Sequence, residues 1–170
     1  MAILPIRYLP DPVLREKAKR VPRIDASIHR LIEDMIESMY AASGVGLAAP
    51  QIGVSLRVIV IGMPEEEPFA LINPQIVKVT GERSVDEGCL SVPGYRAEVT
   101  RHKTTIAKGL TPEGKEIRIK AKDDLLAQAL EHEIDHINGI LYIDHLPSLD
   151  ALEKVERVTP RLPRDRVEEG

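Results

Sequence analysis

The hydrophobic pattern of residues 25–43, DASIHRLIEDMIESMYAAS, is typical of an amphipathic helix. Apolar side chains recur there every three or four residues, so they form one stripe along a helix. The stripe comprises Ile28, Leu31, Ile32, Met35, Ile36, Met39 and Tyr40. Gly44 follows and is a natural signal for the end of a helix. We therefore predict an amphipathic helix in the N-terminal part of the chain, with this stripe buried.

A second helical pattern occupies residues 123–139, DDLLAQALEHEIDHING. Asp123 or Asp124 can cap this helix, and the Asn-Gly pair marks its end. The apolar face of the helix is predicted to begin with Leu125, Leu126, Ala129 and Leu130.

Between the two helical patterns, short β-branched segments separated by turn signals predict strands. The segments are RVIVIG, QIVKVTG, AEVTR, TTIAKGL and KEIRIKA, and TPEG at 111–114 joins the last two as a hairpin. We therefore predict an α+β fold. Antiparallel sheets are expected to pack around the helix of the C-terminal half, which bears HEIDH, together with the N-terminal amphipathic helix.

Length and composition fit one soluble globular domain, so we expect residues 1–170 to form a single domain with a flexible tail at about 160–170. The formal net charge of −4 gives no support to nucleic-acid binding, and no direct nucleic-acid motif is present. No apolar run is long enough for a signal peptide or a membrane span. The single cysteine fits a reducing compartment. We expect a cytoplasmic protein of the bacterial type, or an organellar one if a transit segment was removed.

The sequence His132-Glu133-Ile134-Asp135-His136 matches the HExxH motif. Histidines four residues apart lie on one helix face, so both imidazoles can bind one metal ion. Glu133 is next to the first ligand and is placed to act as a base toward water rather than as a ligand. The motif therefore points to a metal-dependent hydrolase.

A third protein ligand is needed, because catalytic zinc-type sites use three protein ligands and one open position. The metzincin pattern HExxHxxGxxH would place a third histidine at position 142, but Tyr142 is there and His145 is three residues too late. Glu153 or Glu156 could supply a downstream carboxylate, but both are close to the end of the chain. The upstream candidate is Cys89, whose thiolate binds divalent transition metals strongly.

The segment GVGLAAPQIG at 44–53 combines small residues with an amide side chain. It lacks the features of a phosphate-binding loop, since it follows a helix and has no Gly-Lys-Ser/Thr ending. Small residues let a substrate backbone approach closely, and the amide of Gln51 can donate to a developing oxyanion.

Taken together, GVGLAAPQ, EGCLS and HEIDH, in this order, resemble the three motifs of the peptide deformylase family. The similarity extends from DPVLR near the start to HINGILYIDHL. The resemblance implies a catalytic domain that removes the formyl group from the N-terminal formyl-methionine of nascent polypeptides and releases formate. It also implies metal binding by Cys89, His132 and His136, with Fe²⁺ as the cofactor and Zn²⁺, Ni²⁺ or Co²⁺ as substitutes.

The resemblance further implies that Glu133 is the general acid and base. Gln51 and the backbone N–H of Leu90 would donate hydrogen bonds to the formyl oxygen. The residues assigned to substrate binding are Val45, Gly46, Gly88 and Arg96.

Few positions depart from the family pattern, and they are Glu131, Ile137 and Gln128. Of these, Gln128 is one turn before His132, where the pocket wall is usually apolar, so it could alter side-chain preference. We also hypothesise that Arg96 or Arg101 pairs with Glu87 or Asp135 and steadies the site.

Two other functions are compatible with parts of this pattern. An HExxH metallopeptidase that cleaves internal peptide bonds would not need Cys89. A non-catalytic metal-binding or ribosome-associated relative would have little reason to keep Glu133 and Gln51. The partners expected for a deformylase are N-formyl-methionyl nascent peptides and, transiently, the ribosome.

Overall fold

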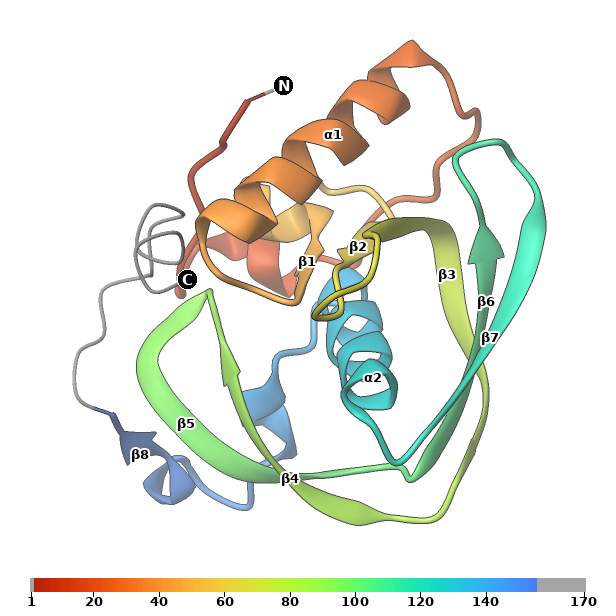
Figure 1. The fold of residues 1–170 in the computed structure, drawn as a ribbon. Helices are drawn as coiled ribbons and strands as arrows, with labels where there is room; N and C mark the ends of the chain where they lie inside the picture. Colours follow the sequence, from red (N-terminus) through yellow and green to blue (C-terminus); the bar gives the residue numbers. More distant parts are fainter. Residues whose placement is uncertain (1, 156–170) are drawn as a thin grey trace.

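The computed structural model describes residues 2–155, so the tail expected at about 160–170 lies outside the described residues. The helices and strands follow one another as shown in Figure 1. They are η1 (Pro12–Arg15), α1 (Ala26–Ala41), β1 (Gly46–Ala48), η2 (Ala49–Ile52), β2 (Val58–Ile61), β3 (Phe69–Thr80), β4 (Arg83–Cys89), β5 (Val92–Arg101), β6 (Thr104–Leu110), β7 (Glu116–Lys122), α2 (Leu125–Ile137), η3 (Tyr142–His145), η4 (Leu149–Ala151) and β8 (Glu153–Lys154).

The N-terminal amphipathic helix is confirmed as α1. The Asp25 carboxylate caps it by accepting the backbone N–H groups of Ser27 and Ile28, which have no partner inside the helix. Most of the predicted stripe is buried, with Ile28, Ile32, Met35 and Met39 in the core. The short helix η1 is also present, and the Asp11 carboxylate caps it.

The strands form two antiparallel sheets, which confirms the α+β fold. The larger sheet has the order β1-β2-β3-β6-β7, and the smaller has the order β4-β5-β8. The predicted 111–114 hairpin joins β6 to β7, where the Gly114 N–H donates to the Thr111 carbonyl over 2.8 Å. Figure 1 shows the smaller sheet and the larger sheet on different sides of α2.

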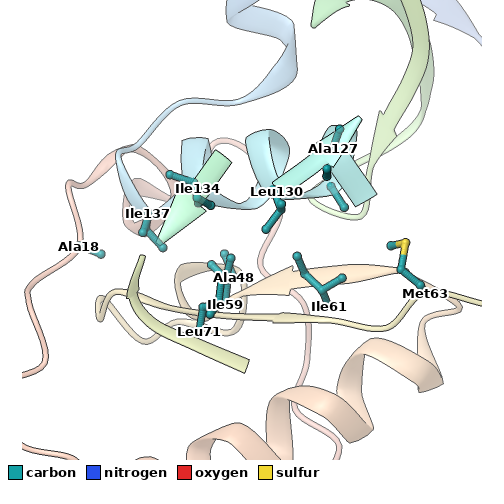
Figure 2. Close-up of a cluster of buried hydrophobic side chains, with 13 residues drawn as sticks. Ala18, Ala48, Ile59, Ile61, Met63, Leu71, Ala127, Leu130, Ile134 and Ile137 are labelled. Atoms are coloured by element: carbon teal, nitrogen blue, oxygen red, sulfur yellow. The ribbon is translucent and has the colours of Figure 1, made fainter. Parts of the chain in front are cut away.

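The larger sheet is covered on both faces near β2, and this explains why all four residues of that strand are buried. Alternate side chains of a strand point to opposite faces. Val58 and Val60 pack in the cluster with α1, whereas Ile59 and Ile61 pack in the cluster with α2. Figure 2 shows the second cluster, in which Leu130 of α2 lies over the strand residues. Each such buried aliphatic side chain stabilises the fold by about 1.5–3 kcal/mol.

Both ends of α2 are fixed by polar contacts. The Asp124 carboxylate accepts the Ala127 N–H over 2.9 Å at the start of the helix. At the other end, the Arg57 guanidinium donates to the Ile137 carbonyl over 3.1 Å, where the helix dipole favours a cation. The apolar face differs from the prediction at Leu125, whose side chain is exposed. No helix in residues 2–155 is long and apolar enough to span a membrane.

Candidate active site

The helix α2 and the end of β4 bring together three side chains that could hold a metal ion. The rings of His132 and His136 are one helical turn apart, with centroids separated by 4.9 Å. The Cys89 Sγ atom lies 3.2 Å from His136 Nε2. One ligand atom from each of the three residues lies within 4.8 Å of the other two. The structure therefore brings together the set that the sequence resemblance implied.

Glu87, two residues before Cys89, fixes the orientation of the first histidine. Its carboxylate lies 2.5 Å from His132 Nδ1, so the Nε2 atom of that ring is left to face the cluster. A carboxylate behind a metal-binding imidazole is a common arrangement, because it sets the tautomer and raises the basicity of the ligand. Sequence reasoning named Glu87 only as a partner for an arginine and missed this contact.

A buried arginine in turn holds Glu87 in place. Arg101 donates to both carboxylate oxygens of Glu87, and its third contact is a 2.8 Å bond to the Asp135 carboxylate. The hypothesis that an arginine pairs with Glu87 or Asp135 is thus confirmed for Arg101, which contacts both. The second arginine of that hypothesis, Arg96, instead forms an exposed ion pair with Asp86 at 2.8 Å.

The charges around the cluster fit a cation. Burial alone would lower the pKa of His132, but the charge of Glu133 and hydrogen bonds with Cys89 and Glu87 raise it well above its usual value. Burial and the neighbouring His132 lower the pKa of His136 well below its usual value. This direction favours the neutral imidazole of His136, the form that binds metals, while the acidic groups favour positive charge beside it. A thiolate and two imidazoles form a donor set suited to a divalent transition metal.

Glu133 lies beside the cluster in a buried position. Burial raises the pKa of its carboxyl to about 7, a value at which a carboxylate can both take and return a proton near neutral pH. Its Oε1 atom has no hydrogen-bond partner among the described residues. Its Oε2 atom lies against the backbone of β1, where a Cβ atom added to Gly46 would be only 2.6 Å away. Only glycine fits at this position without moving Glu133.

Gln51 reaches the cysteine from η2. Its side-chain oxygen accepts the Ala48 N–H over 3.0 Å, which fixes the orientation of the buried amide. Its Nε2 atom donates to Ser91 Oγ over 3.2 Å and lies 3.8 Å from Cys89 Sγ. The Ser91 contact was not foreseen, because the EGCLS motif that includes Ser91 does not show which side chain its hydroxyl contacts.

The remaining predicted residues surround this centre. Leu90 directly follows the cysteine, and its side chain packs in the cluster with α1. Val45 packs against the cluster with α2 and precedes β1. Gly88 lies in β4 at a register shift, and the guanidinium of Arg96 is 3.2 Å from the position a Cβ would take there.

Several residues considered as alternatives have other contacts. His145 pairs with the Asp135 carboxylate at 2.9 Å, and Tyr142 is buried beneath the smaller sheet. Glu153 lies in β8, and Glu156 falls outside the described residues.

Gln128 turns its amide toward β4, where Nε2 donates to Glu87 Oε2 over 3.2 Å.

A Cys-His-His cluster beside the glutamate of an HExxH helix defines a metal-dependent hydrolase. A family model described as polypeptide deformylase matches residues 3–152 of the chain. The chain belongs to the peptide deformylase family.

Individual relatives agree with this membership. The chain is similar to a peptide deformylase of Dehalococcoides mccartyi strain CBDB1, at 58% identity over 156 residues that cover 91% of this chain and 93% of the relative. One from Rhizobium meliloti strain 1021 is 47% identical over 164 residues, or 94% of each chain. A crystal structure of a peptide deformylase from Legionella pneumophila superposes with a TM-score of 0.84 at 49% identity, covering 88% of this chain and 89% of that one.

The protein is therefore a metal-dependent enzyme that removes the formyl group from the N-terminus of formylated nascent peptides. The alternative function, cleavage of internal peptide bonds, is not favoured by these matches.

Proposed function

We propose that Cys89, His132 and His136 hold one Fe²⁺ ion per chain for the deformylation of N-formyl-methionyl peptides. The observation that carries this proposal is the convergence of their three ligand atoms within 4.8 Å, beside the buried Glu133 carboxyl. When bound, the ion activates the attacking water and polarises the formyl carbonyl. The same donors suit Zn²⁺, Ni²⁺ and Co²⁺.

Glu133 is the proposed general base and acid. Its carboxylate takes a proton from the attacking water as the water oxygen forms a bond to the formyl carbon. It then returns the proton to the amine nitrogen as the carbon–nitrogen bond breaks, so that formate and a free N-terminus leave. A pKa of about 7 allows both steps near neutral pH.

Gln51 and Leu90 are the proposed donors to the formyl oxygen. The Gln51 amide is buried and already oriented by Ala48, so little reorganisation is needed when charge develops on that oxygen. The backbone N–H of Leu90 adjoins the cysteine ligand and is the second donor. Removing one such donor typically lowers kcat by about 100- to 1,000-fold.

Four residues are proposed to bind the peptide. Gly46 and Gly88 offer bare backbone to an extended substrate, and Val45 is proposed to line the pocket for the methionine side chain, which fits aliphatic surfaces well. Arg96 has a half-exposed guanidinium beside Gly88 and is proposed to bind a peptide carbonyl.

We further propose that residues 1–170 form one catalytic domain, working in the bacterial-type cytoplasm. A transient contact with the ribosome would bring the enzyme close to nascent chains.

Formate release from a formyl-methionyl peptide tests the function and the roles together. Protein prepared without oxygen and loaded with Fe²⁺ is expected to release formate. Cys89→Ala is expected to abolish both metal binding and activity, whereas Glu133→Gln is expected to retain the metal and lose activity.

The matched control is His29→Gln, which removes an exposed histidine of α1 and is expected to leave metal content and activity unchanged. Full metal content and activity in Cys89→Ala would contradict the ligand assignment. Metal loss in Glu133→Gln would show that this glutamate is a ligand rather than a base.

A further inference from the structure

One face of the larger sheet carries five basic side chains from three adjacent strands. They are Lys78 of β3, Lys108 of β6, and Arg118, Lys120 and Lys122 of β7. We call this surface the basic face. Because neighbouring strands are about 4.8 Å apart, these charges lie close to one another.

The pairing register places these side chains together. Lys108 is directly opposite Arg118, and Ile106 lies between Lys78 and Lys120 on its two neighbouring strands. The alternate residues of the same strands, such as Ile119, pack against the cluster with α2. The basic side chains therefore point away from α2. Figure 1 shows α2 on the inner side of β3, β6 and β7.

No acidic side chain of the described chain neutralises the basic face. None of its five cations forms an ion pair within residues 2–155. Glu116 is on the same face, but at the hairpin end and opposite Leu110. Like charges directly opposite each other destabilise a sheet, so the pair of Lys108 and Arg118 has an unfavourable effect on folding.

Protection of a sheet edge explains only part of this pattern. β7 is an edge strand, and lysines on edge strands prevent pairing with other chains. Lys78 and Lys108, however, lie on strands that have neighbours on both sides. A polyanionic partner accounts for all five positions.

We propose that the basic face binds the phosphate backbone of double-stranded RNA. This proposal rests on the proposed function, because nascent peptides emerge from the RNA-rich ribosome. None of the large hydrophobic side chains exposed in the described chain lies on this face, so it has no group to stack on bases or to enter a lipid layer. An array of cations without exposed aromatic residues is suited to contacts with the phosphates of a duplex.

RNA on this face would leave the active site accessible. The side chains of Leu130, Ile134 and Ile137 connect α2 to the inner side of the sheet. The histidine ligands are on another side of α2, where Cys89 approaches. The net charge of −4 did not indicate this surface, because a net charge sums over the whole chain and does not show where the charges lie.

Fluorescence anisotropy with an RNA duplex of about 16 base pairs tests the proposal on the full, metal-loaded chain. Binding is expected with a Kd of about 10⁻⁴ to 10⁻⁶ M that weakens steeply as salt increases. The triple variant Lys78→Gln, Lys108→Gln and Lys120→Gln is expected to bind about tenfold or more weakly. The steepness of its salt dependence should fall by about 0.9 for each phosphate that the variant no longer neutralises.

The matched control is Lys17→Gln, Lys19→Gln and Lys154→Gln, which removes the same charge from exposed positions outside the basic face. Equal weakening in both triple variants, or no RNA binding by the unmodified chain at low salt, would overturn the proposal. So would tight binding to vesicles rich in phosphatidylserine without binding to RNA. Formate release from a short peptide is measured separately and is expected to be unchanged in both variants, so a failed RNA test does not affect the proposed catalysis.

Discussion

Glu133 and Gly46 show how closely the candidate site is packed at single residues. A methyl group on Gly46 would lie 2.6 Å from Glu133 Oε2 and 2.9 Å from its Cγ, distances that real structures do not tolerate. Because the carboxylate must move, Gly46→Ala is expected to lower kcat/KM by on the order of 100-fold, the loss typical of a misplaced reacting group. Formate release measures the effect, and circular dichroism checks that the fold is kept.

Gly44→Ala is the matched control for this prediction. There the nearest atom to the new methyl group is the end of the flexible Leu90 side chain, at 3.0 Å, which can shift at little cost. Equal losses in the two variants would show that the segment, rather than the contact with Glu133, is responsible.

Glu87 is expected to make the stability of the protein sensitive to acid. Burial would raise its pKa, but hydrogen bonds from His132 and Arg101 lower it from 4.5 to about 2. Since the folded pKa lies below the unfolded one, its contribution is fully present above pH 4.5 and is lost as the pH falls toward 2. The contribution is on the order of 3 kcal/mol.

Urea unfolding at several pH values between 5 and 2, with a chelator present so that metal release does not contribute, measures this effect. The free energy of unfolding of Glu87→Gln should change less across that window than that of the unmodified chain. Parallel pH profiles would contradict the assignment.

At this scale the sequence predicted which residues belong to motifs, but not the contacts that hold those residues in place. The HExxH spacing identified His132 and His136, whereas Cys89 was assigned through the family resemblance. Ser91 closes the EGCLS motif and Gln128 belongs to no motif, and the contacts of both exist only because the β4 segment lies against α2 and η2. Such contacts depend on the tertiary fold and leave no local pattern.

Among the elements, the helices were easier to predict than some of the strands. Periodic apolar residues and caps mark α1 and α2 within a few residues of their ends. β4 was not predicted, because its sequence RSVDEGC is largely polar and it is an edge strand of the smaller sheet. β1 has only three residues, too few to show alternation.

The N-cap of α2 tests whether the stability of this helix can be lowered without a change in metal affinity. Asp124→Ala removes the bond from its carboxylate to the Ala127 N–H and is expected to lower the free energy of unfolding by about 1 kcal/mol. Because the cap is two turns before His132, metal affinity is expected to stay unchanged. Thermal unfolding and metal titration measure the two quantities.

Asp124→Asn is the conservative control, since asparagine caps helices about as well as aspartate. It should restore most of the lost stability. A loss as large as that of the alanine variant would show that charge, rather than capping, is what matters at this position.

At the scale of the whole molecule, the site is assembled from three segments far apart in the sequence. The β1–η2 segment supplies Gln51, β4 supplies Cys89, and α2 supplies the histidines and the glutamate. The α+β class and the helix that bears HEIDH could be predicted from periodicity and motifs. The order of the strands and the division into two sheets could not, because pairing partners are chosen by long-range packing on both faces of the sheet.

This assembly makes metal binding a global stabiliser. The three proposed ligands come together only in the folded chain, so an ion that binds them favours folding by about 2.7 kcal/mol at a free concentration of 100 times its Kd. For a chain of this size, that corresponds to a rise in Tm of roughly 5–10 °C. Thermal unfolding with Ni²⁺ or Co²⁺, compared with chelator, measures the shift.

Two comparisons separate this effect from nonspecific ion binding. Mg²⁺ prefers oxygen ligands and is expected to leave the Tm unchanged, because a thiolate and two imidazoles are poor ligands for it. Cys89→Ser should lose most of the shift with Ni²⁺, whereas His29→Gln should keep it. A shift that survives in Cys89→Ser would mean that the stabilising ion does not depend on Cys89, and the link between β4 and α2 would then come from the contacts of Glu87 with His132 and Gln128.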